Sequence, residues 1–226
     1  TIGVSDVIAS AVIAAFWLYM ASSLGAENYG VVSYFLAIGG IASTISLLGS
    51  QTTLTVYTAK SVRLESTVYF IAIAAGIISS FVLFFTFQNF GLVSYVFGVM
   101  IFGLINGELL GKKLYKEYAK YTLIQKAVMI VLAIGLYSAI GVQGVILGVG
   151  LSFFVYVIRI ILGFRTTKID FSLLRTRSGF ITNNYLLDLS SALNGSLDKL
   201  IIVPFLGFEL LGNYQLGLQL LSILLI

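Results

Sequence analysis

Long apolar stretches separated by short polar connections run through almost the whole chain. Each stretch has roughly 20 residues, which is enough for an α-helix to cross the ~30 Å hydrocarbon core of a bilayer. We therefore expect membrane-spanning helices, because lipid offers the backbone no hydrogen-bond partners outside the segment itself. The predicted spans cover residues 2–23, 31–49, 68–87, 90–110, 122–140, 144–162 and 180–205, and an eighth begins near Tyr214.

Composition supports this all-α membrane class. Of the 226 residues, 59% are apolar and only 10% are charged, with a mean hydropathy of +1.05. So few polar side chains cannot cover a water-soluble globule of this length. Cysteine and histidine are both absent, which excludes disulfides, thiol nucleophiles and Cys/His metal sites. We expect neither a metal nor another cofactor.

Basic residues occupy alternate connections between the spans. The connections 24–30, 88–89, 141–143 and 207–213 contain no Lys or Arg, whereas 50–67, 111–121 and 163–179 contain Lys60, Arg63, Lys112, Lys113, Lys116, Lys120, Arg165, Lys168, Arg175 and Arg177. The positive-inside rule then predicts a multi-pass plasma-membrane protein with a cytoplasmic N-terminus. The net charge of +4 is explained by this topology. We expect anionic membrane lipids, rather than nucleic acid, as partners of these loops.

An internal repeat links the two ends of the chain. The segment LGAENYG at 24–30 reappears as LGFELLG at 206–212, and the pairs Gly25/Gly207, Glu27/Glu209 and Gly30/Gly212 share one constant spacing, as do Asp6 and Asp188. Six spans separate the copies, so both have the same orientation in the membrane. The pattern predicts a first six-helix lobe at 1–162, a linker at 163–179 and the start of a truncated second lobe at 180–226. Four to six further spans are expected to follow.

These same residues carry a resemblance to a known family. The run LGAENYGVVSY at 24–34, the helix that follows it, the run LDKLII at 197–202 and the second copy of the repeat resemble polysaccharide-biosynthesis flippases. The similarity departs from the family pattern at 49–51, where span 2 ends. The resemblance implies a two-lobe transporter that moves a lipid-linked oligosaccharide or polysaccharide precursor from the cytoplasmic to the outer leaflet by alternating access. It further implies a coupling ion, either H⁺ or Na⁺, and no enzymatic activity.

Span 7 has a polar face that can be derived without the family. At 100° per residue, one side of a continuous helix carries Asn184, Asp188, Ser191 and Asp198, with Lys199 at the edge of this sector. A carboxylate within a span costs at least ~2.5 kcal/mol, so such groups face a wet cavity, a substrate or a cationic partner. We interpret this face as a substrate-binding wall. The alternative is that its members only pair with neighbouring helices.

Two cations within spans are weaker candidates for the same site. Lys126 and Arg159 lie near the basic ends of spans 5 and 6, where they either anchor the helices at the interface or attract a substrate phosphate.

Glycines spaced four residues apart predict close packing of helices within the chain. They are Gly103, Gly107 and Gly111 on span 4, and Gly144 and Gly148 on span 6.

Two other classes of function compete with a flippase. A membrane enzyme acting on lipid-linked sugars would need catalytic groups in a sizeable outer loop, and the outer connections here have only a few residues. A multidrug or cation antiporter of the same superfamily is the stronger alternative, because Asp188 and Asp198 would suit a cationic cargo. The sign of the charge in the cavity discriminates between the two transporters: a positive cavity favours a phosphorylated lipid and a negative one favours cations.

Overall fold

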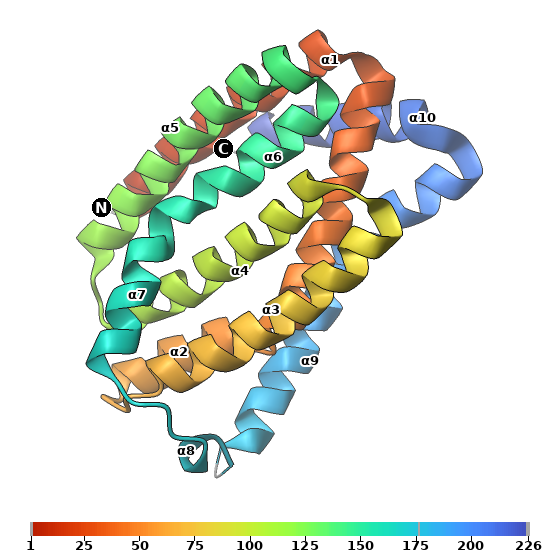
Figure 1. Ribbon diagram of the computed structural model, residues 1–226. Coiled ribbons are helices and arrows are strands. Elements are labelled where there is room, and N and C mark those ends of the chain that lie inside the picture. The colour runs from red at the N-terminus through yellow and green to blue at the C-terminus, as the bar shows by residue number, and fades with distance from the viewer. Residues whose placement is uncertain (1, 176, 225–226) are drawn as a thin grey trace.

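A computed structural model describes residues 2–175 and 177–224, and every regular element in this part of the chain is helical. Figure 1 shows the helices packed side by side as one bundle. In chain order they are α1 (Ile2–Leu47), α2 (Ser50–Ala59), α3 (Glu65–Phe87), α4 (Phe90–Gly111), α5 (Tyr115–Ile140), α6 (Val142–Ser152), the 3₁₀ turn η1 (Phe153–Tyr156), α7 (Val157–Thr166), α8 (Ser172–Arg175), α9 (Ser178–Asn194) and α10 (Leu197–Leu224).

Five helical segments in this part of the chain are long and apolar enough to cross a membrane, which confirms the predicted class. They are Ala9–Leu47, Glu65–Phe87, Phe90–Gly111, Tyr115–Ile140 and Val142–Arg165. The predicted spans 68–87, 90–110, 122–140 and 144–162 lie inside the last four. The last one joins α6 and α7 through the short turn η1.

The first segment, Ala9–Leu47, overlaps most of two predicted spans, 2–23 and 31–49. A straight helix of its 39 residues would be about 58 Å long, nearly twice the ~30 Å thickness of the hydrocarbon core. The chain reverses direction at Gly25, where φ is 75° and ψ is 166°. Glycine adopts this left-handed φ at little cost because it has no Cβ. The turn separates the predicted spans 2–23 and 31–49.

A turn at a glycine with positive φ also occurs in α10. Gly207 has φ of 81° and ψ of 175° within this helix, and the chain folds back after it. Gly25 and Gly207 occupy equivalent positions in the sequence repeat, so the two copies share a backbone conformation as well as residues. Each copy is a helical hairpin with glycine at its turn.

The two hairpins contact each other reciprocally. A Cβ added at Gly30 would overlap the carbonyl oxygen of Phe208, and a Cβ added at Gly212 would overlap that of Ala26. Positions 26 and 30 correspond to 208 and 212 in the repeat, so each copy presents its glycine to the same carbonyl of the other. We call this approximately two-fold arrangement of residues 25–30 and 207–212 the hairpin contact.

Glycines also determine how closely the other helices approach, as the sequence predicts. A Cβ at Gly107 would come within 2.4 Å of the carbonyl oxygen of Gln51 on α2, and one at Gly111 within 2.8 Å of that of Thr55. On α6, a Cβ at Gly148 would lie 2.6 Å from the backbone nitrogen of Ala133 on α5. Close backbone approach of this kind stabilises helix pairs in lipid through van der Waals contact.

Two expectations about the helices are wrong. Residues 50–67 form more than a connection, because α2 occupies Ser50–Ala59 after a break at Leu48 and Gly49, whose φ values are 50° and 72°. Span 7 is not one helix over 180–205. A turn at Gly195 and Ser196 ends α9 and starts α10.

The connections gather at two ends of the bundle. The start of α3 lies beside the segment after α7, where the Ser66 nitrogen donates to the Thr167 hydroxyl at 3.0 Å. This basic end contains the Lys/Arg-bearing connections. We call the other end, which contains the turns at Gly25, Gly141 and Gly207, the glycine end; there the Tyr137 hydroxyl donates to the Ser23 carbonyl at 3.1 Å. The basic connections therefore share one end, as expected, and their cytoplasmic location stays a prediction.

Candidate functional site

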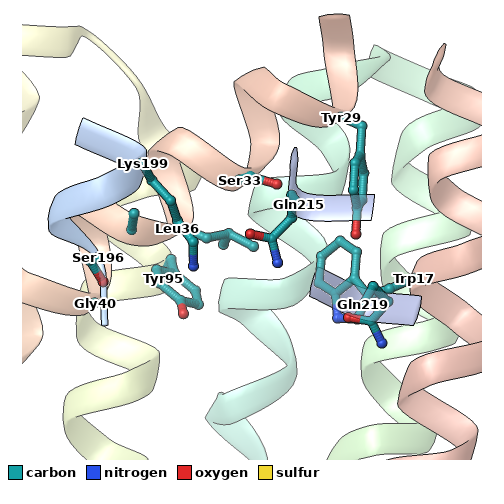
Figure 2. Close-up of a pocket in the computed structure, with 11 residues that line it drawn as sticks. Trp17, Tyr29, Ser33, Leu36, Gly40, Tyr95, Ser196, Lys199, Gln215 and Gln219 are labelled. Atoms are coloured by element: carbon teal, nitrogen blue, oxygen red, sulfur yellow. The ribbon is translucent and has the colours of Figure 1, made fainter. Parts of the chain in front are cut away.

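A cavity of about 360 Å³ lies between α1, α4 and the start and end of α10. We call it the central cavity, and Figure 2 shows the side chains around it. It is lined by Trp17, Tyr29, Ser33, Leu36, Ala37, Gly40, Tyr95, Ser196, Lys199, Gln215 and Gln219. Most of its residues come from the two hairpins, so the hairpin contact positions these walls relative to each other.

Two of the aromatic lining residues, Trp17 and Tyr29, come from the two arms of the α1 hairpin. Trp17 precedes the turn at Gly25 and Tyr29 follows it, which brings their ring centroids to 6.1 Å at an interplanar angle of 59°. Phe16 packs against Trp17 with an edge contact at 5.0 Å. In Figure 2 the Tyr29 hydroxyl points towards the Trp17 side of the cavity. Such side chains offer flat apolar faces together with polar tips.

Lys199 supplies the charge of the central cavity. It lies in the first turn of α10, directly after the break at Gly195 and Ser196, and its side chain extends into the cavity in Figure 2. Among the lining residues it is the one with a formal charge. The neighbouring Asp198 is not among the lining residues; its Oδ2 accepts a hydrogen bond of 2.7 Å from the hydroxyl of Tyr214.

Two glutamines on the second arm of α10 complete the polar lining. Gln215 and Gln219 are four residues apart and therefore share one face of the helix. The Oε1 atom of Gln215 is buried and accepts no hydrogen bond from the described residues. Buried acceptors normally have a partner, and in this position a ligand hydroxyl or a water molecule would supply one.

A second cavity of about 270 Å³ contains part of the polar face predicted for span 7. We call it the Asp188 cavity; its lining is Thr44, Leu47, Gln51, Asp188, Ser191 and Ala192. It lies where α9 crosses the break between α1 and α2. A Cβ at Gly49 would come within 2.8 Å of the backbone nitrogen of Tyr185, so glycine at this left-handed position permits the close approach of α9.

The predicted site residues are thus divided between different places. Asp188 and Ser191 lie together in the Asp188 cavity, and Lys199 lies in the central cavity. Asn184 donates its side-chain amide to the Phe180 carbonyl on its own helix at 2.8 Å. The break before α10 changes the direction of Asp198, because the phase of a single helix does not continue across it.

The two predicted cations of spans 5 and 6 line neither cavity. Arg159 on α7 forms an ion pair with Glu117 and lies over the ring of Tyr121, 5.6 Å from its centroid. Lys126 is partly buried on α5. The partners of Arg159 tie α7 to α5, which fits the structural alternative better than a substrate phosphate.

Sequence reasoning missed most of the central cavity. Trp17 is the single tryptophan of the chain, and Tyr29 belongs to the repeated segment. These two features could have marked both residues as candidates for the site. Gln215 and Gln219 lie four residues apart among leucine and glycine residues in the second arm of α10, a spacing that marks one polar face. Their meeting in one cavity depends on the fold of the two hairpins.

Comparison of the chain with models of known protein families, with curated proteins and with solved structures finds no match.

Proposed function

We propose that this chain forms part of a membrane transporter that moves a lipid-linked oligosaccharide or polysaccharide precursor from the cytoplasmic to the outer leaflet. The observation that supports this best is the central cavity, which combines aromatic, amide and cationic side chains between two related hairpins. A cavity of about 360 Å³ is within the range of small-ligand sites. The resemblance of segments 24–34 and 197–202 to flippases points to the same class.

Each part of the lining matches a part of such a cargo. Trp17 and Tyr29 offer flat faces on which sugar rings pack. The unpartnered Oε1 of Gln215 accepts a hydrogen bond from a sugar hydroxyl. Lys199 attracts the phosphate or pyrophosphate that joins sugar to lipid. The three kinds of group together favour a glycosylated phosphate over a purely apolar solute.

The hairpin contact supports alternating access. In the proposed two-lobe architecture, parallel repeats related by an axis along the membrane normal rock against each other around a midplane site. In that architecture, the reciprocal packing of Gly30 and Gly212 would lie close to such an axis, at the end of the bundle that contains the hairpin turns. Opening towards that end then requires the two hairpins to separate at this contact.

A cation antiporter is the second candidate, and the Asp188 cavity is the observation that favours it. Asp188 is half-buried there beside Ser191 and Thr44, and these oxygens suit a cation or a proton. In the proposed flippase the same group is available to a coupling ion. Lys199 carries the opposite charge, so the two residues discriminate between the two cargoes.

The discriminating experiment compares two variants that each replace a lysine with a neutral side chain, in proteoliposomes containing the full-length protein. Lys199→Gln is expected to lower transport of a fluorescent lipid-linked sugar about tenfold or more, since a hydrogen bond to a charged group contributes about 1.5–3 kcal/mol. Lys126→Gln is the matched control, because this lysine lines neither cavity, and it should transport normally. Equal activity of the two variants, or transport of organic cations but not of lipid-linked sugars, would contradict the flippase proposal.

A further inference from the structure

A third polar cavity, of about 590 Å³, opens at the basic end of the bundle. We call it the basic-end cavity; its polar lining is Thr58, Ser61, Arg63, Glu65, Lys112 and Thr167. The candidate spans begin at Glu65 and end at Gly111 and Arg165. The cavity therefore lies at the level where a bilayer presents its headgroups, and it is separate from the central cavity.

Two buried carboxylates share one lysine beside this cavity. The side chains of Glu65 and Glu108 are each 5% exposed, and the Lys112 ammonium lies 3.2 Å from Glu65 Oε1 and 2.6 Å from Glu108 Oε1. The Tyr69 hydroxyl donates to Glu108 Oε2. Glu65 Oε2, the last of the four carboxylate oxygens, is buried and has no partner among the described residues.

The opposite wall contains an unpartnered hydroxyl. Thr58 Oγ1 is buried without a hydrogen bond from or to the described residues. It lies where α2 packs closely on α4, since a Cβ at Gly111 would come within 2.9 Å of Thr58 Cβ. Buried polar atoms without partners are uncommon, because each one costs about 1–3 kcal/mol of desolvation. Finding one carboxylate oxygen and one hydroxyl in the same lining indicates a ligand that both donates and accepts.

The charges of the cavity are arranged as a pair of opposite signs. Glu65, Glu108 and Lys112 together carry one net negative charge, and no ion pair involves the exposed side chain of Arg63 in the described part of the chain. A guanidinium and a hydroxyl suit phosphate oxygens, and a carboxylate suits an ammonium. A free anion would meet the charge of Glu65, and a free cation would meet Arg63.

We propose that the basic-end cavity binds the zwitterionic headgroup of a phospholipid that joins a phosphate to a primary ammonium, with the phosphate at Arg63 and Thr58 and the ammonium at Glu65. Phosphatidylethanolamine has this chemistry. Phosphatidylcholine has the same charges, but its trimethylammonium has no N–H to donate. The proposal stands on this cavity alone and does not depend on the cargo of the central cavity.

The test measures lipid retention in nanodiscs made of equal parts phosphatidylethanolamine and phosphatidylcholine. Native mass spectrometry of the released protein should show phosphatidylethanolamine retained about tenfold more than phosphatidylcholine, which corresponds to one hydrogen bond between charged groups. Equal retention of the two lipids by the wild-type protein would overturn the proposal.

Isosteric variants locate the binding. Glu65→Gln and Thr58→Val are each expected to reduce the preference several-fold, because the first removes the carboxylate charge and the second the unpartnered hydroxyl, with little change in side-chain volume. Lys112 keeps its pair with Glu108 in the first variant. Arg63→Gln should have the same effect, and as a change at an exposed position it leaves folding intact. An unchanged preference in all three variants would remove the cavity as the site.

Matched controls and soluble ligands complete the design. Lys116→Gln changes an exposed cation of the same end, and Glu27→Gln changes an exposed carboxylate of the other end; both should retain the wild-type preference. Glycerophosphoethanolamine and inorganic phosphate test for a soluble ligand by thermal shift. Stabilisation by either compound equal to that by the lipid would overturn the assignment to a lipid headgroup.

Discussion

The hairpin contact leads to a quantitative prediction that compares two glycines of α1, Gly30 at the contact and Gly40 away from it. In Gly30→Ala, the new Cβ would overlap the Phe208 carbonyl oxygen and lie 2.8 Å from its carbon and 3.0 Å from the Gly212 nitrogen. Carbon atoms in ordinary contact are about 3.5–4.0 Å apart, so the two backbones must separate by about 1 Å. Overpacking of this kind costs about 1–3 kcal/mol. Gly30→Ala is therefore expected to destabilise the hairpin pair.

Gly40→Ala is the matched control for this change. A Cβ at Gly40 meets nothing within 4 Å, and replacing a helical glycine with alanine stabilises by about 0.5–1 kcal/mol. The difference between the two variants isolates the contact, because the helical preference is the same in both. For a chain of this length, about 1 kcal/mol shifts Tm by about 2–4 °C.

Thermal unfolding of the purified protein in detergent checks the prediction. We expect Tm of Gly30→Ala to lie about 3–10 °C below that of Gly40→Ala. Gly212→Ala should behave like Gly30→Ala, with Gly217→Ala as its control, because a Cβ at Gly217 also meets nothing within 4 Å. The double variant Gly30→Ala/Gly212→Ala should lose less than the two single losses together, since the first substitution already separates the backbones. Equal Tm values for Gly30→Ala and Gly40→Ala would refute the reciprocal contact.

Three further predictions concern the orientation of the protein in the membrane, the Asp188 cavity, and the ion pairs of Lys112 with Glu65 and Glu108. A cysteine at Asn28 should react with an impermeant thiol reagent outside the cell and one at Lys116 should not, and the reverse pattern would invert the predicted orientation. A cysteine at Asp188 should react with small water-soluble reagents faster than one at Leu186, which is 56% exposed on the other side of α9; equal protection would favour a packing role. Lys112→Met should lower the free energy of unfolding in urea by about 3 kcal/mol, because it leaves two buried carboxylates without a cation. Burial lowers the pKa of Lys112, but its hydrogen bonds to Glu108 and Glu65 and the charges of both outweigh this and raise the pKa. Its contribution is therefore complete below pH 10.5 and is lost as pH rises through the raised pKa; a loss that begins well below that pH would contradict the pairing.

Helices in lipid were predictable because one physical constraint determines them. A span must be apolar for its full length and must satisfy its own backbone. The boundaries 68–87 and 90–110 therefore fall within three residues of α3 and α4. The glycine repeat was equally informative, since Gly25 and Gly207 mark two turns of the same conformation.

The break between α9 and α10 had no comparable signal. Gly195 has φ of −80° and ψ of −6°, values that any residue can adopt, so its glycine does not identify a turn. The predicted polar face assumed one helical phase from Asn184 to Lys199. The break changes this phase. Asp188 and Ser191, which precede the break, both line the Asp188 cavity, whereas Lys199 lines the central cavity and Asp198 is hydrogen-bonded to Tyr214. Local periodicity could not predict the central cavity, which is formed by residues distant in the sequence.

The break at Leu48 and Gly49 has a mechanical consequence for the second arm of α1. Hydroxyl side chains surround it, and each donates to a carbonyl of its own helix: Ser46 to Ala42 at 2.8 Å, Thr53 to Gly49 at 2.8 Å and Thr55 to Gln51 at 3.0 Å. Such bonds compete with the helical ladder and make a helix easier to bend. We therefore expect the arm to bend more easily near Gly49 than at the hairpin contact. A bend near Gly49 would displace α2 relative to the hairpin contact, which would stay in place.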